Sequence, residues 1–236
     1  MAAGTLILIP TTLGESAPAA VIPQEVQQRA RALDHFVAEN PKTARAFLKQ
    51  VGVSKPLREL HIATLNEHTP DAAIAGLAAP LHAGHDLGVM SEAGCPGIAD
   101  PGAKLVLYAQ RHAIRVVPLV GPSSILLALM ASGLNGQHFV FRGYLPVADA
   151  ARDRALRDLE KQSRRLQQTQ IFIETPYRNQ KLLQGILAAC AGATLLCIAA
   201  EVTLAGEDIR TRTVAEWQKH PPQLDRRPAI FLLQAV

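Results

Sequence analysis

Aromatic side chains make up only 4% of this 236-residue chain, so smaller aliphatic side chains have to fill its core. Long hydrophobic runs are also missing. The longest one, residues 125–131, falls far short of the roughly 18 residues that a membrane-spanning helix needs. Residues 1–4 contain neither the basic region nor the cleavage site of a signal peptide. These features predict a cytoplasmic protein without membrane contact.

Cysteine is nearly as rare, with Cys95, Cys190 and Cys197 as the whole set. Their odd number argues against a disulfide framework, and none of their spacings is that of a Cys-x-x-Cys metal site. The eight histidines never fall into the spacing of a zinc site, so no metal is expected. The G-x-S-x-G elbow of hydrolases, the P-loop lysine and the G-x-G-x-x-G fingerprint of dinucleotide-binding proteins are missing as well.

The composition predicts a globular protein with an ample core, because 48% of the residues are hydrophobic and 19% are charged. The formal net charge of +4 permits an anionic partner such as RNA but does not require one.

Short apolar stretches alternate with helical patterns along the first half of the chain. The expected strands cover residues 5–9, 60–63, 87–90 and 114–118. The expected helices cover residues 24–38, 41–51, 71–82, 101–112 and 125–132. This alternation predicts βαβ units and a mainly parallel sheet. The helix at 125–132 is apolar all round and is therefore expected to be buried.

The second half shows strand patterns at residues 170–173, 194–200, 209–213 and 229–236, with helices at 151–166 and up to about residue 190. We expect a mixed sheet there, and hence an α/β protein with domains at residues 1–120 and 121–236. One face of the helix at 151–166 is basic and carries Arg152, Arg154, Arg157, Lys161, Arg164 and Arg165. A solvated surface and an RNA- or phosphate-binding patch both fit this pattern.

The loop at residues 91–102 joins an expected buried strand to a helix and is rich in glycine and proline. Asp100 can cap the helix, and Pro101 fits its first position. Such a loop presents backbone groups to a polar ligand, although a plain strand-to-helix turn has the same spacing. Ser123 and Ser124 open another helix, whose unpaired N–H groups suit a carboxylate or phosphate, although an ordinary serine cap of a buried helix has the same pattern. Cys95 is expected to line the loop, although a nearby helix N-terminus can also lower the pKa of a thiol.

Five motifs occur in a fixed order at residues 10–14 (PTTLG), 91–102 (SEAGCPGIADPG), 121–124 (GPSS), 143–146 (GYLP) and 174–178 (ETPYR). They resemble the tetrapyrrole (corrin/porphyrin) methylases, a family of S-adenosylmethionine-dependent enzymes. Within that family they are most similar to the branch that methylates ribosomal RNA of the small subunit. The resemblance implies a two-domain homodimer that binds S-adenosyl-L-methionine between its domains. The cofactor-binding residues that it implies are Pro10, Leu13, Gly94, Cys95, Ile98, Ser123, Ser124, Glu174, Val202 and Ala229.

The expected reaction is 2′-O-methylation of a ribose in ribosomal RNA. Methylation of a tetrapyrrole or another small molecule, and a non-catalytic cofactor-binding role, remain alternatives. The acceptor-side motifs differ from those of the branch at residues 39–42 (ENPK), 200–204 (AEVTL) and 227–228 (RP). A hydroxyl acceptor has to lose a proton, and the candidate bases are Glu39, Glu67 and Glu201, all at expected ends of strands or helices. A helix cap or a surface charge is the alternative role for each of them.

Overall fold

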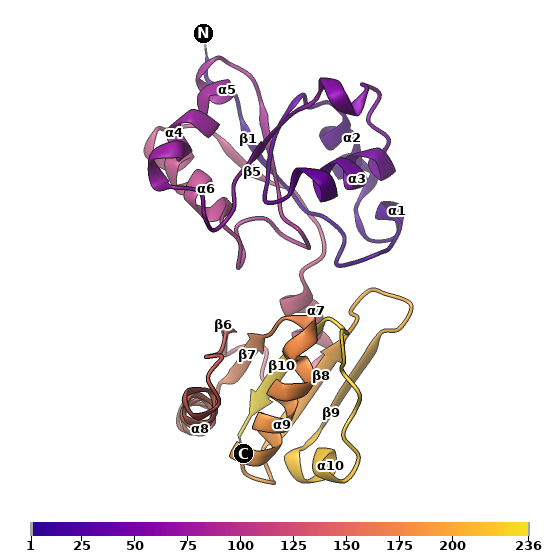
Figure 1. Cartoon of the computed structure of the whole chain (residues 1–236), viewed down its shortest axis with the longest axis vertical. Helices are drawn as coiled ribbons and strands as arrows, with labels where there is room; N and C mark the ends of the chain where they lie inside the picture. Colours follow the sequence, from indigo (N-terminus) through magenta and orange to yellow (C-terminus); the bar gives the residue numbers. More distant parts are fainter. Residues whose placement is uncertain (1, 236) are drawn as a thin grey trace. The chain divides into compact units, whose positions relative to one another are not determined.

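The structure, a computed structural model, describes residues 2–235 and divides into two compact units. The first unit extends to Ser123 and the second begins at Ser124. Each unit has its own five-stranded sheet with helices packed against it (Figure 1). The predicted α/β class is confirmed, because one sheet is parallel and the other is mixed.

The first unit is built on a sheet with the strand order β3-β2-β4-β1-β5, in which every pair is parallel. Its strands are β1 (Leu6–Ile9), β2 (His35–Ala38), β3 (His61–Thr64), β4 (Leu87–Met90) and β5 (Val116–Pro118). The central strand β4 is buried along its whole length, as expected for a strand covered on both faces. All five carboxyl ends therefore lie at one edge of the sheet, where loops can meet.

Side chains of the parallel sheet alternate between two separate cores. Ile9 and Phe36 pack with α1 (Pro18–Val21), α2 (Gln24–Arg31) and α3 (Pro41–Val51) on one face. Leu6 and Val89 pack on the other face, with α4 (Ile74–Leu77), α5 (Ala79–His82) and α6 (Gly102–Arg111). This alternation follows from the two-residue period of a strand.

The connections that leave β1 and β4 run to opposite faces of the sheet. The chain passes from β1 into α1 and α2, whereas it passes from β4 into α6. Because β1 and β4 are neighbours, the order of the strands reverses between them. In open α/β sheets, ligands bind outside the carboxyl ends of the strands at such a reversal.

The second unit has the strand order β6-β7-β10-β8-β9. Its strands are β6 (Phe139–Tyr144), β7 (Thr169–Ile173), β8 (Leu195–Ala200), β9 (Asp208–Thr213) and β10 (Ala229–Gln234). β6 and β7 are parallel, and the other pairs are antiparallel. β10 is the last strand along the chain but lies in the centre of the sheet, between β7 and β8.

Three helices cover one face of this mixed sheet, namely α8 (Asp149–Leu166), α9 (Asn179–Ala189) and α10 (Val214–Lys219). Leu156 of α8 and Ile186 of α9 pack against Phe172 and Phe231 in its core. α7 (Ser124–Ser132) contacts β8, β9 and β10. No helix among residues 2–235 is long and apolar enough to cross a membrane.

The predicted helix at 24–38 is wrong in its second half, because α2 ends at Arg31 and β2 begins at His35. Val26, Ala30, Leu33 and Val37 have helical spacing, but this spacing runs across the loop between a helix and a strand. Phe36, Val37 and Ala38 are consecutive and all buried. Burial of consecutive side chains is typical of an interior parallel strand.

Three further expectations need correction. The predicted helix at 71–82 is broken into short pieces, and Pro80 lies in the first turn of the last one. α7 is not buried all round, because Leu126 and Met130 are 51% and 79% exposed. Arg152 does not belong to the solvated face of α8, because it is only 8% exposed. The strand β6 and the one-turn helix α1 have no predicted counterpart. The remaining strands and α-helices match the predicted ones within a few residues, and Val236, at the end of the predicted strand 229–236, lies outside the described residues.

Candidate functional site

Three loops meet at the carboxyl edge of the parallel sheet, after the adjacent strands β4, β1 and β5. The Thr11 N–H donates to the Gly94 carbonyl at 2.9 Å, which joins the β1 loop to the β4 loop. The buried Thr11 hydroxyl donates to the Ser91 carbonyl at 3.3 Å. The Cys95 thiol donates to the Pro122 carbonyl at 3.4 Å, which joins the β4 loop to the β5 loop. The first, second and third motifs of the sequence are therefore brought together here.

Two glycines in these loops leave no room for a side chain. Gly94 has a φ of +74°, and a Cβ atom there would lie 3.0 Å from Leu13 Cδ2 and 3.1 Å from the Pro122 carbonyl oxygen. A Cβ atom on Gly121 would lie 2.2 Å from Cγ of Pro10. Pro10, Leu13, Gly94 and Gly121 thus form one tightly fitted group in which only glycine permits the close approach of the backbones.

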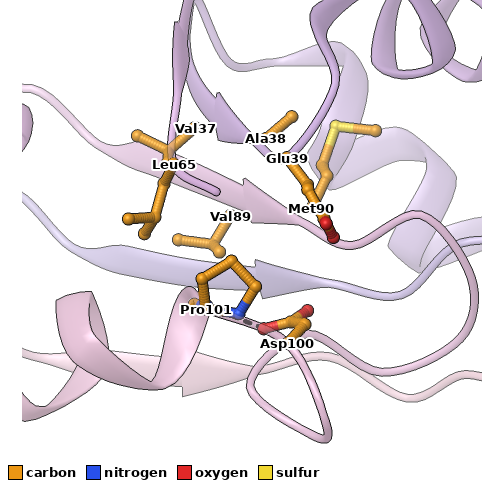
Figure 2. Close-up of a pocket in the computed structure, with 9 residues that line it drawn as sticks. Val37, Ala38, Glu39, Leu65, Val89, Met90, Asp100 and Pro101 are labelled. Atoms are coloured by element: carbon orange, nitrogen blue, oxygen red, sulfur yellow. Dashed lines mark hydrogen bonds between the residues drawn. The ribbon is translucent and has the colours of Figure 1, made fainter. Parts of the chain in front are cut away.

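Asp100 fixes the far end of the β4 loop against α6. Its Oδ1 atom accepts the N–H groups of Gly97 at 2.8 Å and of Gly102, the first residue of α6, at 2.7 Å. The second of these bonds is drawn in Figure 2. Asp100 thus accepts the first N–H of α6 as a cap would, but the predicted positions are wrong by one residue, because Pro101 is the N-cap and the helix begins at Gly102. Burial raises the pKa of this carboxyl, and the two N–H donors oppose the shift.

Glu39, which directly follows β2, and Asp100 line the same small pocket, formed by β2, β4 and the start of α6 (Figure 2). The pocket holds about 10 Å³, which is close to the space of one water molecule. The side chain of Glu39 is half-buried. Burial raises its pKa, and the charges of Glu92, Asp100 and Glu67 raise it further. A carboxylate with a raised pKa is a better proton acceptor than an ordinary surface carboxylate.

The other two candidate bases lie in different surroundings. Glu67 is on an exposed turn after β3, with a side chain 83% exposed and 3.5 Å from His68 Nε2. Glu201 belongs to the second unit, where it forms an ion pair of 2.9 Å with Arg227. The carboxylate of Glu201 is therefore already engaged by a cation of its own unit.

The second-unit residues implied by the family resemblance gather at one edge of the mixed sheet. Ala229 of β10 pairs with Ala200, which directly precedes Glu201 and Val202. The Glu201 N–H donates to the Pro228 carbonyl at 2.8 Å. Glu174 directly follows β7, whose last residue pairs with the second residue of β10. The structure thus brings Glu174, Glu201, Val202 and Ala229 to the same end of the sheet.

Glu174 is held as a charged acceptor. Its Oε1 atom accepts the Thr175 N–H at 2.6 Å and Nη2 of Arg178 at 2.7 Å. Burial by itself raises the pKa of this carboxyl, but the hydrogen bonds from Arg178 and Thr175 outweigh that effect and lower it. The carboxylate of Glu174 is therefore ionised near neutral pH and suited to accept hydrogen bonds.

An open, mainly apolar pocket of about 310 Å³ lies beside Val202. Its other lining residues come from α7, from the loop after β8 and from β9, and they are Leu127, Met130, Ala131, Thr203, Glu207 and Ile209. The Thr203 hydroxyl is buried and has no hydrogen-bond partner among the described residues. A buried polar atom without a partner costs free energy, so this hydroxyl adds to the cost of holding the loop in this conformation.

The backbone of this loop is strained. Glu201 and Thr203 have left-handed φ values of 52° and 69°, and Arg226 on the neighbouring loop has a φ of 59°. Such values are unusual for residues other than glycine, above all for a β-branched threonine. Arg227 stabilises the loop, because its Nη2 atom donates to Glu201 Oε2 and to the Gly206 carbonyl, both at 2.9 Å.

The remaining predicted cofactor residues lie in or directly after the loops that follow β4 and β5. Ser124 begins α7, and Ser123 is the last residue of the first unit. Ile98 is 54% exposed on the β4 loop. Burial raises the pKa of the Cys95 thiol, so the possible lowering by a helix N-terminus is not seen. No group of three or more histidine, cysteine, aspartate or glutamate side chains in residues 2–235 is placed to hold a metal ion.

Three residues that take part in these arrangements were not singled out from the sequence as site residues. They are Thr11, Asp100 and Arg227. Thr11 lies inside a recognised motif and Asp100 was expected only to cap a helix. Arg227 lies at a position where the related branch of the family has a different residue. This difference was the signal in the sequence that could have pointed to Arg227.

The parallel sheet with its glycine-containing loops and the separate mixed sheet define a two-unit α/β fold that solved methyltransferases share. The crystal structure of the methyltransferase CobJ matches 100% of this chain and 95% of its own, with a TM-score of 0.65 and 15% identity. A uroporphyrin-III-C-methyltransferase from Thermus thermophilus matches 98% of this chain and 92% of its own, with a TM-score of 0.55 and 19% identity. At these identities the likeness establishes the fold.

The sequence assigns the chain within that class. Residues 17–218 match the model of the tetrapyrrole (corrin/porphyrin) methylases, and the chain belongs to this family. It is 32% identical over 98% of its length to the ribosomal RNA small subunit methyltransferase I of Escherichia coli O157:H7, covering 78% of that protein. It is 34% identical to the protein of the same name from Mesorhizobium japonicum, with 91% of this chain and 69% of that one covered. The protein is a methyltransferase, and methyltransferases of its family use S-adenosylmethionine as the methyl donor.

Proposed function

We propose that the protein transfers a methyl group from S-adenosylmethionine to RNA of the small ribosomal subunit. The observation that carries this proposal is the 32% identity along 98% of the chain to a methyltransferase named for that RNA. A tetrapyrrole or other small acceptor is not favoured, because the likeness to the methyltransferase CobJ is limited to 15% identity. A ribosomal acceptor also implies a cytoplasmic location.

The residues that the family resemblance implies offer suitable groups to S-adenosylmethionine in each unit taken by itself. In the first unit, the amino-acid part of the cofactor would be held by backbone groups of Gly94 and Cys95 and by the hydroxyls of Ser123 and Ser124. The side chains of Pro10, Leu13 and Ile98 would lie beside it. In the second unit, the pocket beside Val202 offers an apolar surface to a purine ring. Glu174 would accept hydrogen bonds from ribose hydroxyls, with Ala229 next to it. The bound sulfonium supplies an electrophilic methyl group, so the protein needs to align the acceptor and exclude water.

We propose Glu39 as the group that takes the proton from an acceptor ribose hydroxyl. It is half-buried, it lines a pocket at the carboxyl edge, and its pKa is raised. Glu67 is too exposed to be held in one geometry, and the carboxylate of Glu201 is engaged by Arg227. General-base catalysis of this kind contributes roughly 10²–10⁴-fold in rate. Ribose 2′-O-methylation is the acceptor chemistry that such a base supports.

A homodimer is part of the proposal, since the family resemblance implies one. The exposed apolar side chains of Leu126 and Met130 on α7 support it, because they provide apolar surface for contact with a second copy. Light scattering after size exclusion measures the mass directly. If the protein is a monomer at all concentrations up to the millimolar range, the proposed homodimer is wrong, and the proposed activity is not affected.

The proposal is tested by mapping the methyl groups of small-subunit ribosomal RNA from a strain that has this gene and from a strain in which it is deleted. Purified protein and S-adenosylmethionine should restore one missing ribose methyl group in subunits from the deletion strain. Calorimetric titration with S-adenosylmethionine and with its demethylated product tests the cofactor independently. No binding at millimolar concentrations would overturn the cofactor assignment. An unchanged methylation map with intact cofactor binding would overturn the acceptor.

A further inference from the structure

The outer face of α8 carries a row of basic side chains that lies opposite its buried face. Leu156, Leu159 and Ser163 of α8 are buried. The exposed residues Arg154, Arg157, Lys161 and Arg165 follow one another at intervals of three or four positions. At 3.6 residues per turn, this spacing places them in one line along the helix, over roughly 16 Å.

Most of this positive charge is not neutralised within the protein. Among the described residues, no carboxylate forms an ion pair with Arg154, Arg157 or Arg165. Lys161 lies 3.9 Å from Asp158, but both side chains are more than half exposed and such a contact is weak. The buried Arg152 differs from them, because it lies 3.1 Å from Asp149 and against Gly185. The exposed cations are therefore free to contact an anionic partner.

Two exposed tyrosines lie near the start of the same helix. Tyr177 is 70% exposed, and the guanidinium carbon of Arg178 lies 5.2 Å from the centre of its ring. Tyr144 is 57% exposed and pairs with Ile173, the last residue of β7 before Glu174. Exposed aromatic rings beside arginine are typical of surfaces that stack unpaired bases.

An ion pair joins α9, the helix that follows Tyr177 along the chain, to the beginning of α8. Nζ of Lys181, on the helix that follows Arg178, lies 2.8 Å from Oδ1 of Asp149, the first residue of α8. Figure 1 shows α8 beside β6 and β7 in the second unit. A path can therefore be followed from the Glu174 edge of the sheet, past the two tyrosines and along the basic row.

We propose that Tyr144, Tyr177, Arg154, Arg157, Lys161 and Arg165 form an RNA track, on which unpaired nucleotides of the small-subunit RNA lie. The inference rests on the proposed function, because it takes the acceptor to be that RNA. Bases adjacent to the modified nucleotide stack on the tyrosines, and the phosphates further along contact the basic row. Single-stranded RNA fits better than duplex RNA, because a duplex hides its base faces from stacking.

The track is tested with the full protein and unmethylated small ribosomal subunits. The variant R154Q/R157Q/K161Q/R165Q removes the basic row, and R29Q/K49Q/R58Q/R111Q removes the same charge from exposed positions of the first unit. Binding is measured at several salt concentrations, together with KM and kcat for methyl transfer. Calorimetry with S-adenosylmethionine checks that each variant folds and binds the cofactor.

We expect the track variant to bind subunits at least tenfold more weakly and to raise KM with little change in kcat. The logarithm of the association constant decreases as the logarithm of the salt concentration rises. The steepness of this decrease should lessen by about 0.7 for each phosphate that the track variant no longer neutralises. The control variant should change the steepness far less. Tyr177→Ala should weaken binding roughly fivefold or more because the stacking surface is removed, and Tyr177→Phe should retain it.

The outcomes separate the two proposals. If the wild-type protein methylates the subunits and the track variant matches the control variant in affinity and salt slope, the RNA track is wrong and the proposed function stands. If Tyr177→Phe loses as much affinity as Tyr177→Ala, stacking on this ring is wrong. If the wild-type protein binds S-adenosylmethionine but neither binds nor methylates small subunits, the proposed acceptor and the track both fail.

Discussion

Arg227 donates a hydrogen bond of 2.9 Å from Nη2 to Oε2 of Glu201, which joins two loops whose residues are 26 positions apart in the chain. The same Nη2 atom donates to the Gly206 carbonyl at 2.9 Å. Together these bonds hold a loop in which Glu201 and Thr203 have left-handed backbone conformations. The loop forms one wall of the pocket beside Val202, so its shape is set by a residue outside the pocket.

Arg227→Ala should destabilise the protein by about 1–2 kcal/mol, because it removes two hydrogen bonds from a charged donor at a partly exposed position. It should also weaken S-adenosylmethionine binding, since the strained loop is no longer held. Urea denaturation and calorimetry measure the two effects. Lys219→Gln, at an exposed position of the same unit, should change neither. If Arg227→Ala binds the cofactor as tightly as the wild type, this loop does not form part of the cofactor site.

Gly121→Ala should destabilise the first unit by roughly 1–3 kcal/mol, since its Cβ would lie 2.2 Å from Pro10 Cγ and the two loops would have to separate. Gly136→Ala is the matched control, because its Cβ would meet nothing within 4 Å and its φ is not in the left-handed region. Thermal unfolding of both variants provides the comparison. Equal stability of the two variants would show that the contact between the β1 and β5 loops is not tight.

Glu39→Gln should lower the rate of methyl transfer by about 10²–10⁴-fold and leave cofactor affinity unchanged. The rate of the wild-type enzyme should rise with pH as Glu39 loses its proton, and Glu39→Gln should lack this rise. Glu67→Gln is the control, because Glu67 is exposed and should affect turnover little. Full turnover by Glu39→Gln would exclude Glu39 as the base.

The same carboxyl predicts a pH dependence of stability. Its pKa is raised in the folded protein, first by burial and then by Glu92, Asp100 and Glu67, so folding favours its protonated form. Its favourable contribution is complete below the ordinary pKa of glutamate and is lost as the pH rises through the higher folded-state pKa. Glu39→Gln should therefore be more stable than the wild type at neutral pH, and the gain should vanish in acid. Chemical denaturation at several pH values tests this, with the exposed Glu59→Gln of the same unit as the reference.

Cys95→Ala should retain most of the activity, because burial raises the pKa of the thiol and leaves little thiolate at neutral pH. Burial raises the pKa of Cys190 to about 12, and it also raises that of Cys197. Iodoacetamide should therefore modify all three slowly in the folded protein, with the partly exposed Cys95 reacting first. Mass spectrometry follows the reaction. Loss of turnover in Cys95→Ala with normal cofactor binding would instead indicate a chemical role for the thiol.

Much of the fold follows from local sequence patterns, because strands and helices alternate with clear turn residues between them. Asn40 and Gly52, for example, mark the two ends of α3 through a side-chain cap and a left-handed residue. The strand β2 was missed for a physical reason, since an apolar spacing of 26, 30, 33 and 37 satisfies a helical period by chance. A completely buried parallel strand has no alternation that would identify it.

The candidate site was predictable to the extent that it lies at strand ends. The loops after β1 and β4 come together because their strands are neighbours in a parallel sheet. The contact of Glu201 with Arg227 depends on β8 and β10 being neighbours, which no local pattern in the sequence shows. The burial of Arg152 was not predictable either, because it depends on the glycine at position 185 of another helix.

The central place of β10 in the mixed sheet governs when the second unit can be completed during synthesis. β10 fills the gap between β7 and β8, so until it has left the ribosome both strands keep an unpaired edge. A nascent chain that stops before residue 229 lacks the strand that joins the two halves of this sheet, and it carries two edges open to wrong pairing. Premature termination before the last strand therefore removes the whole unit and creates an aggregation-prone fragment.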